Sequence, residues 1–169
     1  MTQLVYHPAF DPYNCLLRIV RILLELKEGG EAATIRMLDF YLLFPENISK
    51  ARLTTSLRSA VGKLKLQSRF PYDRMPAART LLERMNPAFE ASLQTLITKG
   101  LVAKPEKDHR LFLQKKQLPE ELLNLALKHN KDEKNLMEIL SALAREFPVQ
   151  GPNGLKDRSG LMEFRYDVL

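Results

Sequence analysis

Residues 76–114 read PAARTLLERMNPAFEASLQTLITKGLVAKPEKDHRLFLQ, and this stretch carries the clearest topological signal in the chain. Its first ten residues have helical character. Asn86 and Pro87 then have the composition of a helix start, with asparagine as N-cap and proline at the first position. Phe89, Leu93 and Leu96 recur at helical spacing before Gly100 ends the helix. The short apolar runs around the polar turn 105–109 predict a β-hairpin.

Helix, turn, helix and two-stranded ribbon is the order of a winged helix-turn-helix, which we therefore predict over residues 74–116. In a DNA-reading domain of this kind, the second helix faces base edges in the major groove. The residues expected on its outer side are Glu90, Gln94, Thr95 and Thr98, which make an acidic to neutral face. Such a face favours contact with the DNA backbone elsewhere on the protein over the reading of a specific operator.

Helices are also predicted before this unit. The first begins at Asp11 as N-cap and stops at Gly29-Gly30, with a core stripe and with Arg18 and Arg21 on the opposite side. The second covers residues 31–44 and buries Asp39. Because buried carboxylates are normally paired, Asp39 should meet either Arg36 or an arginine of the first helix.

A third helix is expected from about Ser49, as its N-cap, to Val61. After the hairpin, residues 118–130 predict a short helix, and Asn130 is the candidate N-cap of a longer one that closes before Pro148. The fold class is mainly α, or α+β, with a winged helix-turn-helix core, additional N- and C-terminal helices and a short hairpin. We expect one domain over residues 1–169, in four parts: 12–66, 74–116, 118–148 and a docking tail at 150–169.

The tail ends on an alternation in which Met162, Phe164, Tyr166 and Val168 would share one side of an extended strand. This strand would pair within the chain or add to the sheet edge of a partner. The candidate docking residues of the tail are Arg158, Phe164, Arg165 and Tyr166.

Composition excludes several classes of protein. The chain has 169 residues, 45% of them hydrophobic, which is typical of a globular protein. Its longest apolar run, 16–26, is interrupted by charges and is too short to span a membrane, and the N-terminus lacks the pattern of a secretory signal. We therefore expect a cytoplasmic protein.

No catalytic, cofactor or metal site is predicted, and we expect the chain not to be an enzyme. The single cysteine, Cys15, lies in an apolar pattern typical of a buried, inert thiol. The histidines His7, His109 and His129 lack metal-ligand spacing, and no phosphate-binding glycine motif is present.

The net charge of +6 is concentrated in residues 50–84. Such a patch contacts nucleic acid or an acidic protein surface, or is merely solvated. The candidate contact residues there and on the hairpin are Lys63, Lys65, Arg69, Arg74, Arg79, Arg84, Lys104, Lys107 and Arg110.

Four stretches together resemble a known family: YHPAFDPYNCLLRIVRIL (6–23), IRMLDFYLLFP (35–45), MNPAFEASLQTLITKGLV (85–102) and GLKDRSGLMEFRYD (154–167). They are similar to the middle components of bacterial ABC three-component conflict systems, among them the Lamassu anti-phage and anti-plasmid systems. The resemblance implies a winged-helix accessory subunit, without catalytic activity or cofactor, that joins an SMC- or Rad50-like coiled-coil ATPase to an effector, often a nuclease. Non-specific contact with double-stranded DNA would occur within that complex. The alternative is a free-standing winged-helix transcriptional regulator.

Overall fold

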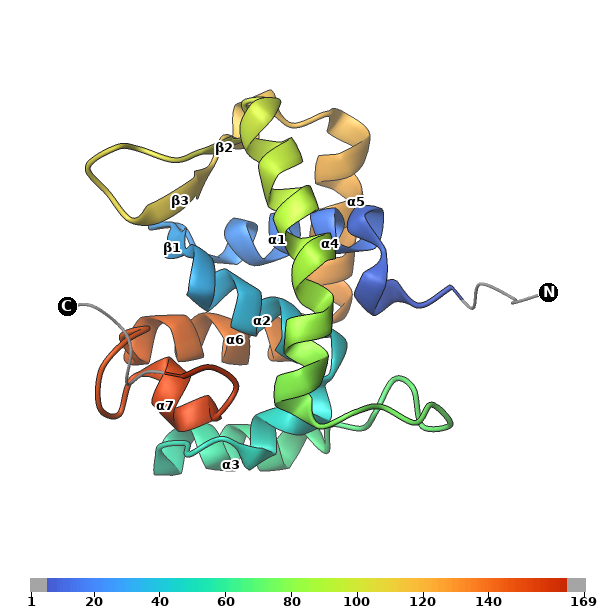
Figure 1. Ribbon diagram of the computed structural model, residues 1–169, viewed down its shortest axis with the longest axis vertical. Helices are drawn as coiled ribbons and strands as arrows, with labels where there is room; N and C mark the ends of the chain where they lie inside the picture. Colours follow the sequence, from blue (N-terminus) through green and yellow to red (C-terminus); the bar gives the residue numbers. More distant parts are fainter. Residues whose placement is uncertain (1–5, 164–169) are drawn as a thin grey trace.

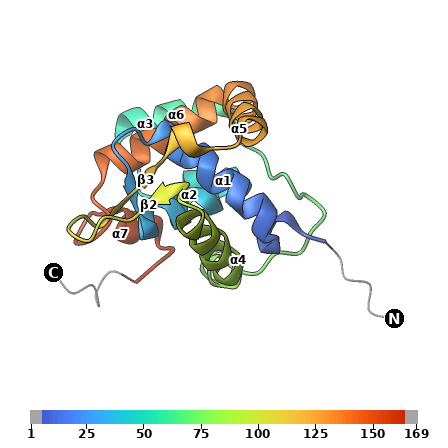
Figure 2. The same ribbon diagram turned by 90° about the horizontal axis from the view of Figure 1, so that it is seen from above.

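The first long helix, α1 (Pro12–Glu25), lies at the centre of the fold. The structure is a computed structural model and describes residues 6–163. The carboxylate of Asp11 accepts a hydrogen bond from the backbone N–H of Tyr13, which confirms the predicted N-cap. Elements from both halves of the chain pack against α1 (Figures 1 and 2), so that little of its middle reaches solvent.

Arg18 and Arg21, predicted on the side of the helix opposite its apolar stripe, are both buried because of this central position. Helical periodicity alone places them opposite the apolar stripe. In the fold, however, that opposite side of α1 is also covered, and each guanidinium meets a carboxylate from a distant part of the chain.

The second helix, α2 (Ala32–Leu43), is buried nearly all round, as its run of apolar residues requires. A 3₁₀-helix, η2 (Pro45–Lys50), follows it directly. The next helix, α3 (Thr55–Leu64), begins later than predicted: Thr54 is its N-cap, and its hydroxyl accepts from Leu57 N–H. Ser49 instead donates to the carbonyl of Glu46 within η2, so its prediction as the N-cap was wrong.

The helix α4 (Ala78–Thr98) passes without interruption through Asn86 and Pro87, which corrects the predicted turn. Proline inside a helix removes one backbone hydrogen bond and crowds the preceding turn. Here the ring of Pro87 is exposed, and the carbonyl left without its donor belongs to Glu83, which also lies at the surface. The buried side of α4, with Leu82, Met85 and Phe89, packs continuously along the N-terminal helices and holds the two halves together.

Three short strands form an antiparallel sheet in the order β1-β3-β2. The predicted hairpin is confirmed as β2 (Val102–Ala103) and β3 (Arg110–Leu113), while β1 (Gly30–Glu31) was not predicted. Gly29 has φ +75°, and a Cβ there would lie 2.7 Å from the carbonyl oxygen of Leu111. Only glycine therefore allows the chain to approach β3 this closely before it enters α2.

After a 3₁₀-helix, η3 (Lys115–Gln117), the chain forms α5 (Glu120–Asp132) and α6 (Lys134–Glu146). Asn130 is buried inside α5, so its predicted role as an N-cap was wrong. Its side chain instead accepts from Arg21 Nε and donates to the carbonyl of Arg21. This reciprocal contact needs a partner more than a hundred residues away, which local sequence does not reveal.

The short helix α7 (Leu155–Ser159) brings the end of the described chain back onto the fold (Figure 1). Leu155 and Leu161 are buried in the same core as α1 and α2. Residues 161–163 are not a strand, and Phe164, Arg165 and Tyr166 lie outside the described residues, so the predicted strand is otherwise untested. Among residues 6–163, no helix combines the length and apolar composition needed to cross a membrane.

Candidate interaction surfaces

Two ion-pair clusters, one buried and one partly exposed, join distant parts of the chain. In the first, Arg18 Nε donates to Asp39 Oδ1 at 2.5 Å, and Arg18 Nη2 to Oδ2 at 3.3 Å. Asp39 therefore pairs with an arginine of the first helix, one of the two predicted alternatives. Burial alone would lower the pKa of Arg18, but the charge and hydrogen bonds of Asp39 raise it above its ordinary value.

The thiol of Cys15 lies beside this pair, with Sγ 3.6 Å from Asp39 Oδ2. Burial, followed by the negative charge of Asp39, raises the pKa of Cys15 well above its usual range. The thiol therefore stays protonated and donates to the carboxylate. Its environment is that of a structural cysteine and not of a nucleophile.

The second ion pair joins three parts of the chain at Glu133, between α5 and α6. Arg21 Nη2 lies 2.6 Å from Glu133 Oε2, and Arg69 binds the other carboxylate oxygen. Burial acts to raise the pKa of Glu133, but the hydrogen bonds and charges of Arg69 and Arg21 bring it below its ordinary value. Arg69 also donates to the carbonyl of Leu42, so this candidate contact residue ties the fold together.

The remaining predicted basic residues do not form one patch. Arg79 and Arg84 lie on the outer side of α4, where Arg79 pairs with Glu163 at 2.5 Å. Lys104 and Lys107 lie on the exposed turn of the hairpin, where Arg110 pairs with Asp108 at 2.8 Å. The third group lies at and after the end of α3 and contains Lys63, Lys65 and, in the loop beyond, Arg69 and Arg74.

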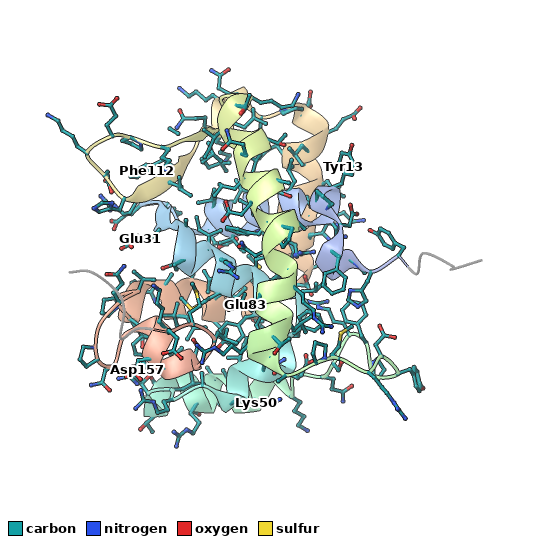
Figure 3. All side chains as sticks on the ribbon, viewed as in Figure 1. Tyr13, Glu31, Lys50, Glu83, Phe112 and Asp157 are labelled. Carbon is teal, nitrogen blue, oxygen red and sulfur yellow. The ribbon has the colours of Figure 1, made fainter. Side chains whose placement is uncertain are left out.

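The outer side of α4 is mixed in charge. Glu90, Gln94, Thr95 and Thr98 are all exposed, as predicted. Gln94 Nε2 donates to Thr98 Oγ1 within the helix at 3.2 Å. Glu83, labelled on the same helix in Figure 3, is exposed and lies beside Arg79 and Arg84. Carboxylates and internally bonded amides leave this helix with little attraction for phosphate.

By contrast, α3 presents an outer face without any carboxylate. We call Thr55, Arg58, Ser59, Gly62 and Lys63 the α3 outer face; all five are exposed. By helical spacing, Thr55, Ser59 and Gly62 form its centre, with Arg58 on one edge and Lys63 on the other. Neither Arg58 nor Lys63 forms an ion pair with any of residues 6–163.

A second surface, which sequence reasoning missed, lies at the start of α1. Tyr6, Phe10 and Tyr13 are 67%, 45% and 85% exposed, and we call them the N-terminal aromatic cluster. The hydroxyl of Tyr6 donates to Asp11 Oδ2 at 2.7 Å, and Asp11 Oδ1 accepts from the backbone N–H of Tyr13, so one carboxylate contacts the side chain of Tyr6 and the backbone of Tyr13. Figure 3 shows Tyr13 projecting away from the body of the protein. The sequence feature that could have revealed this surface is the presence of three aromatic residues around the predicted N-cap.

Arg158, predicted to dock a partner, makes contacts within the chain. Its guanidinium lies 4.4 Å from the ring centroid of Phe147, and it donates to the carbonyls of Asn153 and Arg52. The backbone N–H of Arg52 donates in turn to the carbonyl of Arg158. Arg158 thus fixes α7 against the segment before α3.

Nothing in the described part of the chain gathers three or more histidine, cysteine, aspartate or glutamate side chains into a metal-binding group. The family model described as ABC-three component (ABC-3C) system Middle Component 5 matches residues 4–167. No curated protein and no solved structure matches the chain.

Proposed function

The chain belongs to the Middle Component 5 family of ABC-three component systems, and from this membership we propose that it is a non-catalytic accessory subunit. In this proposal it joins an SMC- or Rad50-like coiled-coil ATPase to an effector subunit, most readily a nuclease, in a Lamassu-type complex that defends the cell against phages or plasmids. The observation that carries the proposal is the family match, because it covers residues 4–167 of the 169.

The N-terminal aromatic cluster supports a role in protein assembly. Tyrosine and phenylalanine are enriched in the centres of protein interfaces, where they bury a large area at a small cost in side-chain entropy. The side chain of Tyr6 is held by Asp11, and the same carboxylate fixes the backbone at Tyr13. We propose that a partner subunit of the three-component system covers this cluster.

The order of elements supports a winged-helix arrangement on a different set of elements from the one predicted. In this proposal α2 and α4 are the helix pair and the β2-β3 hairpin is the wing, which is supported by the element order α1-β1-α2, then α4-β2-β3, and by the sheet order β1-β3-β2. Residues 44–77, including α3, then form an insertion between the paired helices. We propose this arrangement as the scaffold of the subunit.

A free-standing winged-helix regulator is the alternative function. It would place α4 against base edges, and the mixed charge of that helix disfavours such contact. A regulator would bind its own promoter in preference to other DNA, with a specificity of three or more orders of magnitude. Equal binding to promoter and unrelated duplexes would exclude this alternative.

Substitution within the aromatic cluster tests the proposed assembly. The full-length protein is co-expressed with the products of the neighbouring genes and purified through an affinity tag. We expect Phe10→Ala combined with Tyr13→Ala to reduce recovery of a partner at least about tenfold, as loss of interface aromatics does. Tyr72→Ala is the matched control, since Tyr72 is 97% exposed in the loop before α4. Equal recovery with both variants would place the contact elsewhere.

A further inference from the structure

We propose that the α3 outer face binds the phosphate backbone of double-stranded DNA without reading its sequence. This goes beyond the proposed assembly role and does not depend on it. Figure 3 shows Lys50, in the segment just before α3, well below Tyr13 in the view.

In the sequence, the charged residues in and around α3 are all basic. Residues 47–72 contain six basic residues and no acidic one: Lys50, Arg52, Arg58, Lys63, Lys65 and Arg69. Two of the six are held in ion pairs, Arg52 with Asp157 and Arg69 with Glu133. Arg58, Lys63 and Lys65 remain exposed without ion-pair partners among the described residues, so their charges are available to an anionic partner.

The arrangement of these residues matches a polyphosphate chain. The hydroxyls of Thr55 and Ser59 lie along the centre of the α3 outer face, and the two cations lie along its edges. Hydroxyl groups and basic side chains are the groups that contact DNA phosphates in proteins. Ten helical residues extend about 15 Å, a length over which one DNA strand carries about four phosphates measured along the duplex axis.

Gly62 indicates independently that a partner comes close to the backbone of α3. Glycine destabilises the interior of a helix relative to alanine. A Cβ at Gly62 would meet no atom within 4 Å, so the fold does not require glycine there. A bare backbone at the centre of the outer face lets a bulky partner come close.

Beyond the end of α3, the basic surface continues into a groove of about 500 Å³. Lys65, Lys131 and Lys134 line it, together with Asp132 and Glu133. Glu133 is already neutralised by Arg21 and Arg69. At the other end of α3, Glu146 lies 3.5 Å from Thr54, so the attraction for phosphate is greatest towards Lys63 and the groove.

A nucleic acid fits this face better than an acidic protein does. Protein interfaces have apolar or aromatic centres. The large exposed apolar side chains of the described chain are Tyr6, Phe10, Tyr13, Tyr72, Leu125 and Leu127, and none of them lies on α3. The centre of the α3 outer face offers hydroxyl groups and bare backbone instead.

Fluorescence anisotropy with the full-length protein and a labelled 30-base-pair duplex tests the proposal. We expect the protein to bind duplexes of unrelated sequence equally, with affinity falling steeply as salt rises. Arg58→Glu combined with Lys63→Glu should weaken binding at least about tenfold and flatten the salt dependence by about two ions, one for each lost phosphate contact. Circular dichroism verifies that the variant is folded.

Lys116→Glu combined with Lys128→Glu is the matched control, because it changes the net charge equally at two exposed lysines outside α3. We expect it to stay within about twofold of the unmodified protein, since affinity for phosphate depends on local contacts. Absence of binding by the unmodified protein at low salt, or an equal loss in both variants, would overturn the proposal.

Co-purification of the same variants with the neighbouring gene products separates this proposal from the proposed function. If the α3 variant keeps DNA binding but loses a protein partner, α3 is a protein contact and the proposal fails, while the assembly role stands. If the α3 variant alone loses DNA binding, and even the unmodified protein retains no partner, the proposal holds and the assembly role fails.

Discussion

At the residue scale, the interior depends on charges that are paired across the fold. Arg18 is only 3% exposed and binds Asp39, and it also donates to the carbonyl of Pro8 at 3.1 Å. Removing one member of a buried ion pair leaves the other as an uncompensated charge. The pair therefore couples α1 to α2 mainly because separating the two charges would leave one of them buried and unpaired, and less because of the attraction between them.

We predict that Asp39→Ala lowers the free energy of unfolding by about 3–5 kcal/mol, because it leaves Arg18 buried without its counter-ion. Replacing both residues, as Arg18→Met with Asp39→Leu, should recover most of this loss. Urea unfolding followed by circular dichroism measures both effects. A loss below about 1 kcal/mol for Asp39→Ala would show that Arg18 reaches solvent instead.

The pKa of Glu133 predicts a pH dependence. Its pKa is lowered in the folded protein, so the group contributes stability above its ordinary pKa of 4.5, and this contribution is lost as pH falls through the folded value. We expect Glu133→Gln to be less stable than the unmodified protein at pH 7. The difference should shrink as pH falls below 4.5, as measured by urea midpoints from pH 7 to pH 3. A difference that stays constant with pH would contradict this assignment.

At the element scale, sequence predicted the elements whose signals are local. Asp11 caps α1, the apolar run of residues 31–44 forms α2, and the polar turn at 105–109 joins the hairpin. The two residues of β1 carry no periodicity to detect. The partners of Arg21 and Asn130 were not predicted because they come from distant segments. The aromatic cluster was missed because Asp11 was interpreted only as a helix start and not as the centre of an exposed surface.

The helix α4 shows how tertiary packing overrides a local signal. Asn-Pro is a good helix start, yet Leu82, Met85 and Phe89 share one buried side across it. We predict that Pro87→Ala raises the free energy of unfolding by about 1–3 kcal/mol, because it restores the backbone hydrogen bond to Glu83. Thermal unfolding measures the gain. If Asn86 and Pro87 began a separate helix, the substitution would leave stability unchanged or lower it.

At the scale of the whole molecule, the C-terminal segment completes the core. Leu155 and Leu161 are buried, and Arg52 and Arg158 exchange hydrogen bonds between α7 and the segment before α3. We predict that ending the chain at Asn153 causes loss of cooperative unfolding, because each buried leucine contributes about 1.5–3 kcal/mol. Leu127→Ala, at an exposed position, is the control. Cooperative unfolding of the truncated protein, measured by scanning calorimetry, would show that α7 is dispensable.

The central claim is that this chain acts as a component of an assembly, and size-exclusion chromatography of co-expressed proteins tests it most directly. The full-length chain is produced together with the products of its neighbouring genes, among which the proposed function expects an ATPase and an effector. The account predicts that it elutes in one complex with the ATPase and that substitution of Phe10 and Tyr13 by alanine releases it. Elution of the unmodified chain alone, with the ATPase and the effector each at their separate positions, would contradict it.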